Sequence, residues 1–203
     1  MSNLSLSTRM ILVLTLITVL SGGILAGWDM YTKPKVAYHR LQALKAAIGH
    51  VLPDHGMYES QETETGTLYF GKTDSLAESP VGVAFMAIGS GFQGEVRIMV
   101  GLTPDLMKLT GIKVLEQIET PGLGTKIVVD PSNKQDPFWF PKQFEGIVVS
   151  PEIVVLKNAK PSANNEVQGI TGATISSKAI ARIINDKIKA VQKTLSSTEG
   201  RES

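Results

Sequence analysis

The stretch GITGATISSKAIARIINDKIKAVQKTL, residues 169–195, decides the fold of this chain. From about Ser176 to Leu195 its aliphatic residues recur every three or four positions, which predicts an amphipathic helix. These aliphatic residues form one stripe: Ile180, Ile183, Ile184, Ile188, Val191 and Leu195. Charged residues surround the stripe: Arg182, Asp186, Lys187, Lys189 and Lys193. We therefore expect this helix to close a domain by packing its stripe against the core.

Strand-like segments precede this helix. They are separated by Gly, Pro, Ser and Asp clusters, as hairpins and turns require. The expected strands are Thr67–Phe70, Val81–Ile88, Glu95–Leu102 and Leu109–Ile118. A further strand is expected over Ile147–Leu156, bent by Pro151. Strands first and a packed helix last predict an α+β fold with a mainly antiparallel sheet and a C-terminal helix.

An uncharged apolar run extends from Met10 to Trp28 and is long enough to cross a bilayer as a helix. Arg9 and Asp29 bracket it. The competing interpretation is a cleaved signal peptide, because small residues lie at Ser21–Gly23 and Ala26–Gly27. A cleavage site of the Ala-x-Ala kind is absent there. We therefore predict a retained single span.

The segments on either side of this run complete the expected organisation. Val36–Ile48 has apolar residues at helical spacing and predicts a helix behind the span. The chain then divides into a short tail (1–9), a transmembrane helix (10–28), a helical connector (29–55), the main domain (56–195) and a flexible tail (196–203). Basic residues cluster just behind the span: Lys33, Lys35 and Arg40. By the positive-inside count alone, this cluster would place the main domain in the cytoplasm.

Composition excludes several classes of function. The formal net charge of +1 lacks the basic excess typical of nucleic-acid binding. The chain has no cysteine, and its three histidines all lie at or before residue 55. Thiolate clusters, Ser-His-Asp catalysis and histidine-ligated metals are therefore not expected in the main domain. We predict no catalytic and no metal-binding residue, so an organic cofactor must carry any redox chemistry.

One glycine-rich segment follows the last central strand. It comprises Glu119, Thr120, Pro121, Gly122, Leu123, Gly124, Thr125 and Lys126. The two glycines let the backbone approach a ligand closely, and the proline stiffens the turn. Lys126 is a candidate to neutralise a phosphate. An ordinary strand-to-loop connection with a solvated lysine is the alternative.

A second such segment, Gly169–Ser177, runs directly into the terminal helix. A helix start exposes unpaired N–H groups and a partial positive charge, which favour phosphate binding. The alternative is a simple helix cap, but capping needs one hydroxyl. This segment offers four: Thr171, Thr174, Ser176 and Ser177. It lacks the Gly-Lys-Ser/Thr ending of a P-loop and the Gly-x-Gly-x-x-Gly pattern of dinucleotide sites.

These two segments carry a family resemblance. Thr171–Thr174, followed by Ile175–Ala179, resembles the flavinylation motif of the FMN-binding domain in the G subunit of Rnf electron transport complexes. Val114–Gly124 resembles the other signature of that domain. The C subunit of the sodium-pumping NADH:quinone reductase carries a similar domain, but the length of this chain is more like that of the Rnf protein. The match covers most of the chain. It departs from the family pattern at Gln168, where the family usually has Asp.

The resemblance implies one covalent FMN per chain. A flavin transferase would use FAD to attach FMN through a phosphoester to Thr174, the last residue of the motif. The segment Glu119–Gly124 would lie against the isoalloxazine, with Leu123 and Thr120 as the main contacts. The remaining implied cofactor-binding residues are Pro121, Gly122, Lys126, Gly169, Thr171, Gly172, Ala173 and Ser177.

The resemblance also implies a function and a place in the cell. The chain would be a membrane-anchored flavoprotein subunit of an ion-translocating ferredoxin:NAD⁺ oxidoreductase, a translocase, without independent turnover. Its partners would be the other membrane and peripheral subunits, the transferase and the lipid bilayer. It would cross the inner membrane once with its FMN domain on the periplasmic side, opposite to the charge count. The alternatives are a component like the C subunit of the quinone reductase, a lone anchored flavoprotein, and a non-redox scaffold domain.

Overall fold

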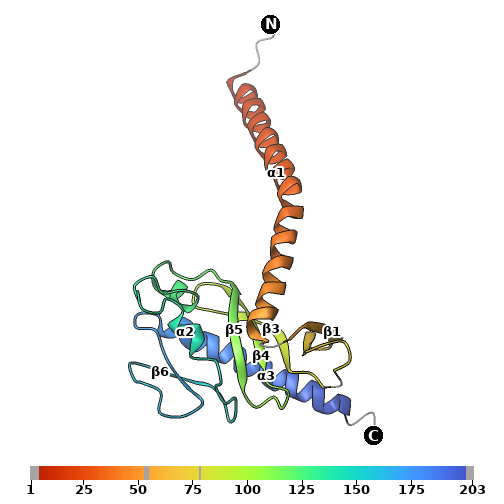
Figure 1. The fold of residues 1–203 in the computed structure, drawn as a ribbon. Coiled ribbons are helices and arrows are strands. Elements are labelled where there is room, and N and C mark those ends of the chain that lie inside the picture. Colours follow the sequence, from red (N-terminus) through yellow and green to blue (C-terminus); the bar gives the residue numbers. More distant parts are fainter. Residues whose placement is uncertain (1–4, 53–54, 78, 200–203) are drawn as a thin grey trace. The chain divides into compact units, whose positions relative to one another are not determined.

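The computed structural model describes residues 5–52, 55–77 and 79–199 of the chain. They belong to two compact units, Met1–Ala43 and Leu44–Ser203. The first unit consists of most of the helix α1, which extends without a break over Leu6–Val51 (Figure 1). By length and composition α1 could cross a membrane. The expected span and the expected helix behind it are therefore parts of one helix, which contains Pro34.

The second unit is built on an antiparallel five-stranded sheet in the order β1-β2-β3-β4-β5. The strands are β1 (Met57–Thr63), β2 (Gly66–Lys72), β3 (Gly82–Ser90), β4 (Glu95–Leu102) and β5 (Leu109–Glu116). The α+β class and the antiparallel sheet are thus confirmed. The edge strand β1, MYESQET, is not predicted from the sequence because it is mostly exposed and has no alternation of apolar and polar residues.

The expected strand over Ile147–Leu156 is wrong for most of its length. Only β6 (Val154–Leu156) forms a strand there, paired in parallel with β7 (Glu166–Gln168). The side-chain amide of Asn185 donates to the Ile153 carbonyl and accepts the Ile153 N–H, both at 2.9 Å. A side chain of the last helix therefore satisfies backbone groups that a longer strand would have paired.

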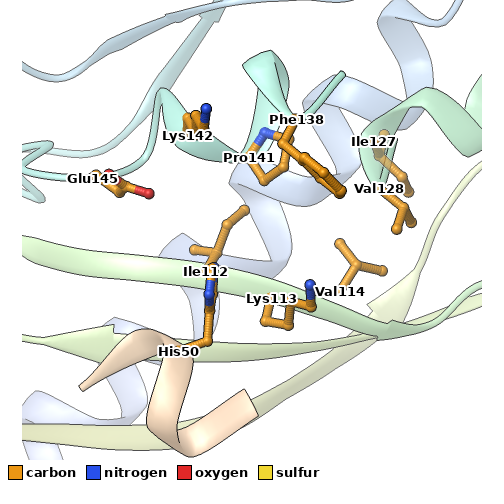
Figure 2. Close-up of a pocket in the computed structure, with 10 residues that line it drawn as sticks. All are labelled: His50, Ile112, Lys113, Val114, Ile127, Val128, Phe138, Pro141, Lys142 and Glu145. Carbon is orange, nitrogen blue, oxygen red and sulfur yellow. The ribbon is translucent and has the colours of Figure 1, made fainter. Parts of the chain in front are cut away.

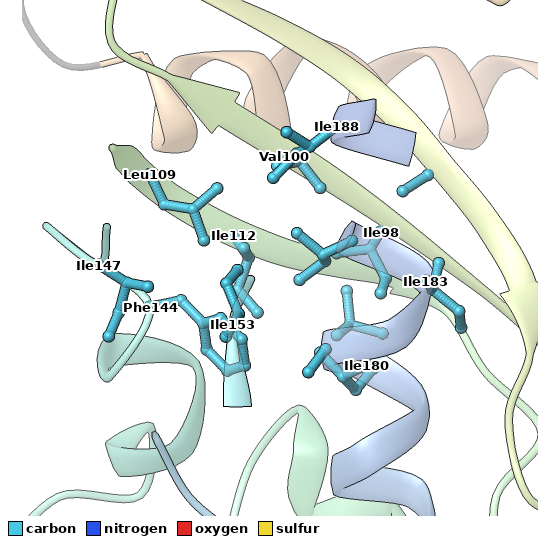
Figure 3. Close-up of a cluster of buried hydrophobic side chains, with 14 of the residues drawn as sticks. Ile98, Val100, Leu109, Ile112, Phe144, Ile147, Ile153, Ile180, Ile183 and Ile188 are labelled. Carbon is cyan, nitrogen blue, oxygen red and sulfur yellow. The ribbon is translucent and has the colours of Figure 1, made fainter. Parts of the chain in front are cut away.

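The last helix, α3 (Thr174–Glu199), crosses one face of the sheet (Figure 1). Its predicted stripe is confirmed: Ile180, Ile183, Ile184, Ile188 and Val191 are buried, and Leu195 packs at the edge. Figure 3 shows this stripe facing Ile98 and Val100 of β4. Burying it supplies a large part of the apolar stabilisation of the domain. Residues 196–199 continue α3, while residues 1–4 and 200–203 of the two expected tails lie outside the described part.

The opposite face of the sheet is covered at its centre by the end of α1. Ala47, Ile48 and Val51 are buried there with Ala84 of β3 and Met99 of β4. Two central strands covered on both faces need nearly continuous apolar sequence, which β3 and β4 have. The 3-10 helix η1 (Gly124–Ile127) and the short helix α2 (Trp139–Lys142) close the side of the core next to β5.

Candidate functional site

Three segments that are far apart in the sequence meet at the start of α3. The carboxylate of Glu119, which is buried, lies at the centre of this junction. Ser176, in the first turn of α3, donates its hydroxyl hydrogen to one carboxylate oxygen at 2.6 Å. The backbone N–H groups of Phe92 and Gln93 donate to the other oxygen at 2.6 and 3.3 Å. Glu119 thus connects the turn between β3 and β4 to the start of α3.

Glycines make this close packing possible. A Cβ atom at Gly124 would lie 2.7 Å from a Glu119 carboxylate oxygen and 3.1 Å from Ser176 Oγ. Gly172 has φ +83°, and a Cβ there would lie 3.3 Å from a methyl group of Leu123. The two glycine-rich segments singled out in the sequence are therefore in contact with each other.

The hydroxyl groups at the start of α3 fall into two pairs. Ser176 and Ser177 are buried, and Ser177 Oγ accepts the Ile170 N–H at 3.0 Å and donates to the Ala173 carbonyl at 2.9 Å. Thr174 is half-buried and Thr171 is exposed. Within residues 5–52, 55–77 and 79–199, neither threonine hydroxyl forms a hydrogen bond with another residue. The serines are committed to packing, whereas the threonines remain available.

The first backbone N–H groups of α3 are also available. The Ala173 N–H donates to the Ile170 carbonyl, and the Ser177 N–H donates to the Ala173 carbonyl. Between them, the N–H groups of residues 174–176 find no acceptor in the described part of the chain. Unpaired N–H groups at the start of a long helix favour an anion. The local geometry therefore fits a phosphate beside the hydroxyl of Thr174.

Exposed apolar side chains border the junction. They are Phe92, Ile118, Leu123 and Ile175, with exposures between 47% and 69%. Each belongs to, or directly adjoins, a segment held by Glu119. A flat apolar ring would cover surface of this kind, as exposed apolar patches commonly mark binding sites. The residues present thus fit both parts of FMN, the phosphate and the isoalloxazine.

The 119–124 turn is held mainly by its own backbone. The Thr120 carbonyl accepts the N–H groups of Leu123 and Thr125, both at 3.2 Å. Pro121 and Gly122 are exposed, and Gly122 has φ +74°, which favours glycine. The turn therefore presents Leu123 on a fixed backbone.

Lys126 lies in a different set of contacts from the one expected for a phosphate ligand. Its ammonium donates to Ser132 Oγ at 3.0 Å and lies 3.2 Å from a carboxylate oxygen of Asp130. The Ser132 hydroxyl, with Trp139 Nε1 and Lys126, lowers the pKa of Asp130 to about 2. We call these four residues the Asp130 cluster. A phosphate role for Lys126 stays a prediction.

Two positions before the motif are held by backbone contacts. The Gly169 N–H donates to the Leu156 carbonyl at 2.8 Å, at the end of the β6–β7 pair. The side-chain amide of Gln143 bonds both the N–H and the carbonyl of Gln168, at 2.8 and 3.2 Å. These contacts fix the chain that leads into Ile170, whose N–H is bonded to Ser177.

The turn that contains Phe92 and Gln93 and the role of Ser176 are not among the features predicted from the sequence. The turn begins and ends with glycine, and the Gly91 N–H donates to the Gly94 carbonyl at 2.7 Å. A glycine pair at this spacing was the available signal. Nothing in the sequence alone pairs this turn with Glu119, which lies more than 20 residues further along the chain.

A cavity of about 210 Å³ lies elsewhere, between β5, η1 and α2 (Figure 2). Its lining is mainly apolar, with basic and acidic groups at the rim. The lining residues are His50, Ile112, Lys113, Val114, Ile127, Val128, Phe138, Pro141, Lys142 and Glu145. None of them is among the predicted cofactor-binding residues, so the candidate site is the surface junction around Glu119.

The chain is similar to several known proteins. Residues 91–189 match the family described as FMN-binding domain, a range that includes the whole junction. The chain is 38% identical over 103 residues to the G subunit of the Na(+)-translocating ferredoxin:NAD(+) oxidoreductase complex of Acetobacterium woodii. That match covers 51% of this chain and 45% of the relative. The chain is 25% identical to the G subunit of the ion-translocating oxidoreductase complex of Methanosarcina acetivorans, over 91% of this chain and 94% of the relative.

A solved structure shows the same fold. It is the C subunit of the Na(+)-translocating NADH-quinone reductase from Parabacteroides distasonis, with a TM-score of 0.52 and 24% identity. The likeness covers 64% of this chain and 62% of that protein. The sheet followed by a C-terminal helix is therefore a known fold.

Proposed function

We propose that the chain is a membrane-anchored flavoprotein that relays electrons within an ion-translocating oxidoreductase. Residues 91–189 match the FMN-binding domain family, and the chain is similar to the G subunits of such complexes. When bound, FMN accepts and passes on electrons. The chain itself would hold the cofactor and fix its place. Other membrane and peripheral subunits of the complex would be its electron-transfer partners.

The finer part of the proposal is a phosphoester between one FMN and the hydroxyl of Thr174, made by a flavin transferase. The observation that carries it is the start of α3, where an uncommitted hydroxyl lies beside unpaired backbone N–H groups. These N–H groups would hold the phosphate oxygens. Leu123, which lies against Gly172, would contact the ring. A covalent link would keep the cofactor in one place.

The test compares Thr174→Ala with Thr171→Ala in native full-length protein. The control changes the other uncommitted hydroxyl of the same segment. We expect wild type to carry an added mass of one FMN less water and to fluoresce in a denaturing gel. Thr171→Ala changes a motif residue but not the acceptor, so its modified fraction should show the same added mass even if that fraction is smaller. Thr174→Ala should lose both signals. Retention of the added mass by Thr174→Ala would contradict attachment at this residue, and a colourless wild type would favour the scaffold alternative.

For the membrane, we propose a single crossing of the inner membrane by α1, with the FMN domain on the periplasmic side. The exposed apolar side chains of α1 from Met10 onwards support the crossing. The side follows from the resemblance and runs against the basic residues behind the span. Protease treatment of intact spheroplasts should degrade the domain. Protection until the membrane is opened would reverse the assignment.

Co-purification distinguishes the remaining alternatives. A subunit of an Rnf-type complex should purify from gently solubilised membranes with other redox subunits of that complex. Partners from a sodium-pumping quinone reductase would favour the component like the C subunit of that enzyme. A flavin-bearing chain that purifies alone would favour the lone flavoprotein.

A further inference from the structure

Glu119 is a buried carboxylate without a described basic partner. Three donors surround it: the N–H groups of Phe92 and Gln93 and the hydroxyl of Ser176. No lysine, arginine or histidine in the described residues forms an ion pair with it. Neutral donors stabilise a carboxylate without cancelling its charge. An ionised Glu119 therefore has no counter-ion among the described residues.

This charge lies close to the proposed cofactor position. Glu119 bonds Ser176, which is two residues after Thr174 in the same helical turn. Little water reaches the carboxylate, because it is buried and the chain packs closely around it at Gly91 and Gly124. A charge with weak solvent screening acts over a longer distance than an exposed one.

We propose that Glu119 is a positioning residue whose buried charge also lowers the reduction potential of the flavin, an inference that rests on the proposed function. An electron accepted by the flavin without a proton would add negative charge near the start of α3. A neighbouring carboxylate disfavours that addition by Coulomb repulsion. The hydrogen bonds of Glu119 meanwhile hold the 91–94 turn and α3 in place.

Two substitutions separate the charge of Glu119 from its packing. Glu119→Gln removes the charge but keeps an oxygen that can accept the Phe92 and Gln93 N–H groups. Its amide can donate to Ser176 Oγ, whose hydroxyl rotates to accept. Ser176→Ala does the opposite: it removes one hydrogen bond and leaves the carboxylate charged. A purely structural role predicts similar effects of the two changes on the flavin.

The experiment is a spectroelectrochemical titration of the full-length, flavin-loaded protein in detergent, after mass spectrometry has shown the FMN content of each variant. We expect Glu119→Gln to raise the midpoint potential, by about tenfold in the equilibrium constant for reduction, or ~59 mV for a one-electron step. Ser176→Ala should shift it much less. Glu119→Asp, which keeps the charge, should stay near the wild-type value even if its FMN content falls.

Several outcomes would overturn the inference. An unchanged potential in a folded, flavin-loaded Glu119→Gln variant would remove the charge effect while leaving the proposed function intact. An equal rise in Ser176→Ala would assign the shift to packing. If Glu119→Gln fails to fold, Glu119→Met, of similar length and uncharged, takes its place with the same expected rise. Wild-type protein without FMN would overturn both the inference and the proposed function.

Discussion

Glu119 and Asp130 are buried to nearly the same extent, with 5% and 6% exposure, but their surroundings differ. Asp130 has a lysine ammonium 3.2 Å away and accepts the indole N–H of Trp139 at 3.2 Å. Glu119 has two backbone N–H groups and a hydroxyl. One carboxylate is thus paired with a cation, and the other is held by neutral donors alone. Burial alone therefore does not reveal what a carboxylate does.

The packing next to the two carboxylates differs as well. Trp139 packs edge-on against Phe140, a fully buried core residue, so the Asp130 cluster is tied to the core. The Glu119 junction is bordered by exposed apolar side chains such as Phe92 and Leu123. We expect changes around Asp130 to alter the stability of the fold and changes around Glu119 to alter the proposed flavin site.

The largest effect on stability is expected for Phe140→Ala. Removing this fully buried ring should lower the free energy of unfolding by about 4 kcal/mol, from lost burial and the cavity left behind. Urea denaturation measures the change. Phe138→Ala, at an exposed neighbour, should cost less than half as much. Equal costs would show that the Asp130 side of the domain is not anchored in the core.

Asp130→Asn should have the next largest effect on the free energy of unfolding. It removes the charged acceptor of hydrogen bonds from Ser132 and Trp139 and the ion pair with Lys126, at a cost of about 2 kcal/mol. The matched control is Asp136→Asn, whose partner Lys142 is exposed. That surface pair is exposed to solvent screening, so its loss should cost much less than the change at Asp130. A larger loss in the control, measured by urea denaturation, would contradict the comparison.

The stability of the protein at low pH should depend on the same carboxylate, Asp130. The folded-state pKa of Asp130 is about 2, below its ordinary 3.8, so its contribution to stability is fully present above about pH 4. That contribution is lost as the pH falls from about 4 towards 2. Denaturation curves between pH 5 and pH 2 should therefore slope less for Asp130→Asn than for wild type. Parallel slopes would rule out Asp130 as the source of the stability loss at low pH.

The smallest effect on stability is expected for Leu123→Ala. The side chain is exposed, so the free energy of unfolding should change by no more than about 0.5 kcal/mol. If the proposed flavin contact is correct, the absorption and fluorescence of bound FMN should nevertheless change. Leu76→Ala, at another exposed leucine, should leave both unchanged. Identical flavin spectra in the two variants would place the ring elsewhere.

The sequence predicted the parts of the fold in which buried residues recur at a regular spacing. The spacing of the α3 stripe is set by helix geometry, and β4 has the predicted bounds, Glu95–Leu102. The exposed strand β1 has no such period and was missed. The strand predicted over Ile147–Leu156 was wrong for most of its length because its apolar residues pack without strand pairing. The Asn185 side chain instead bonds the backbone of Ile153.

The candidate site was predictable only in pieces. Glycine and hydroxyl patterns mark each glycine-rich segment, but no local pattern shows that Glu119 meets Phe92 and Ser176. Such contacts depend on how the sheet places distant turns, which a single sequence does not contain. Lys126 and Asp130 are four residues apart, a spacing that favours an ion pair and could have been weighed against a phosphate role.

One helix carries both the core and the proposed attachment point, and this has a consequence for the order of biosynthesis. In the folded chain, packing of the buried isoleucines against the sheet sets the position of α3 and of its first turn. A newly made chain that has not packed them presents Thr174 on an unordered loop, without an aligned set of backbone N–H groups. Under the proposed chemistry, maturation of the cofactor then follows folding, and flavin fluorescence reports chains that have already folded.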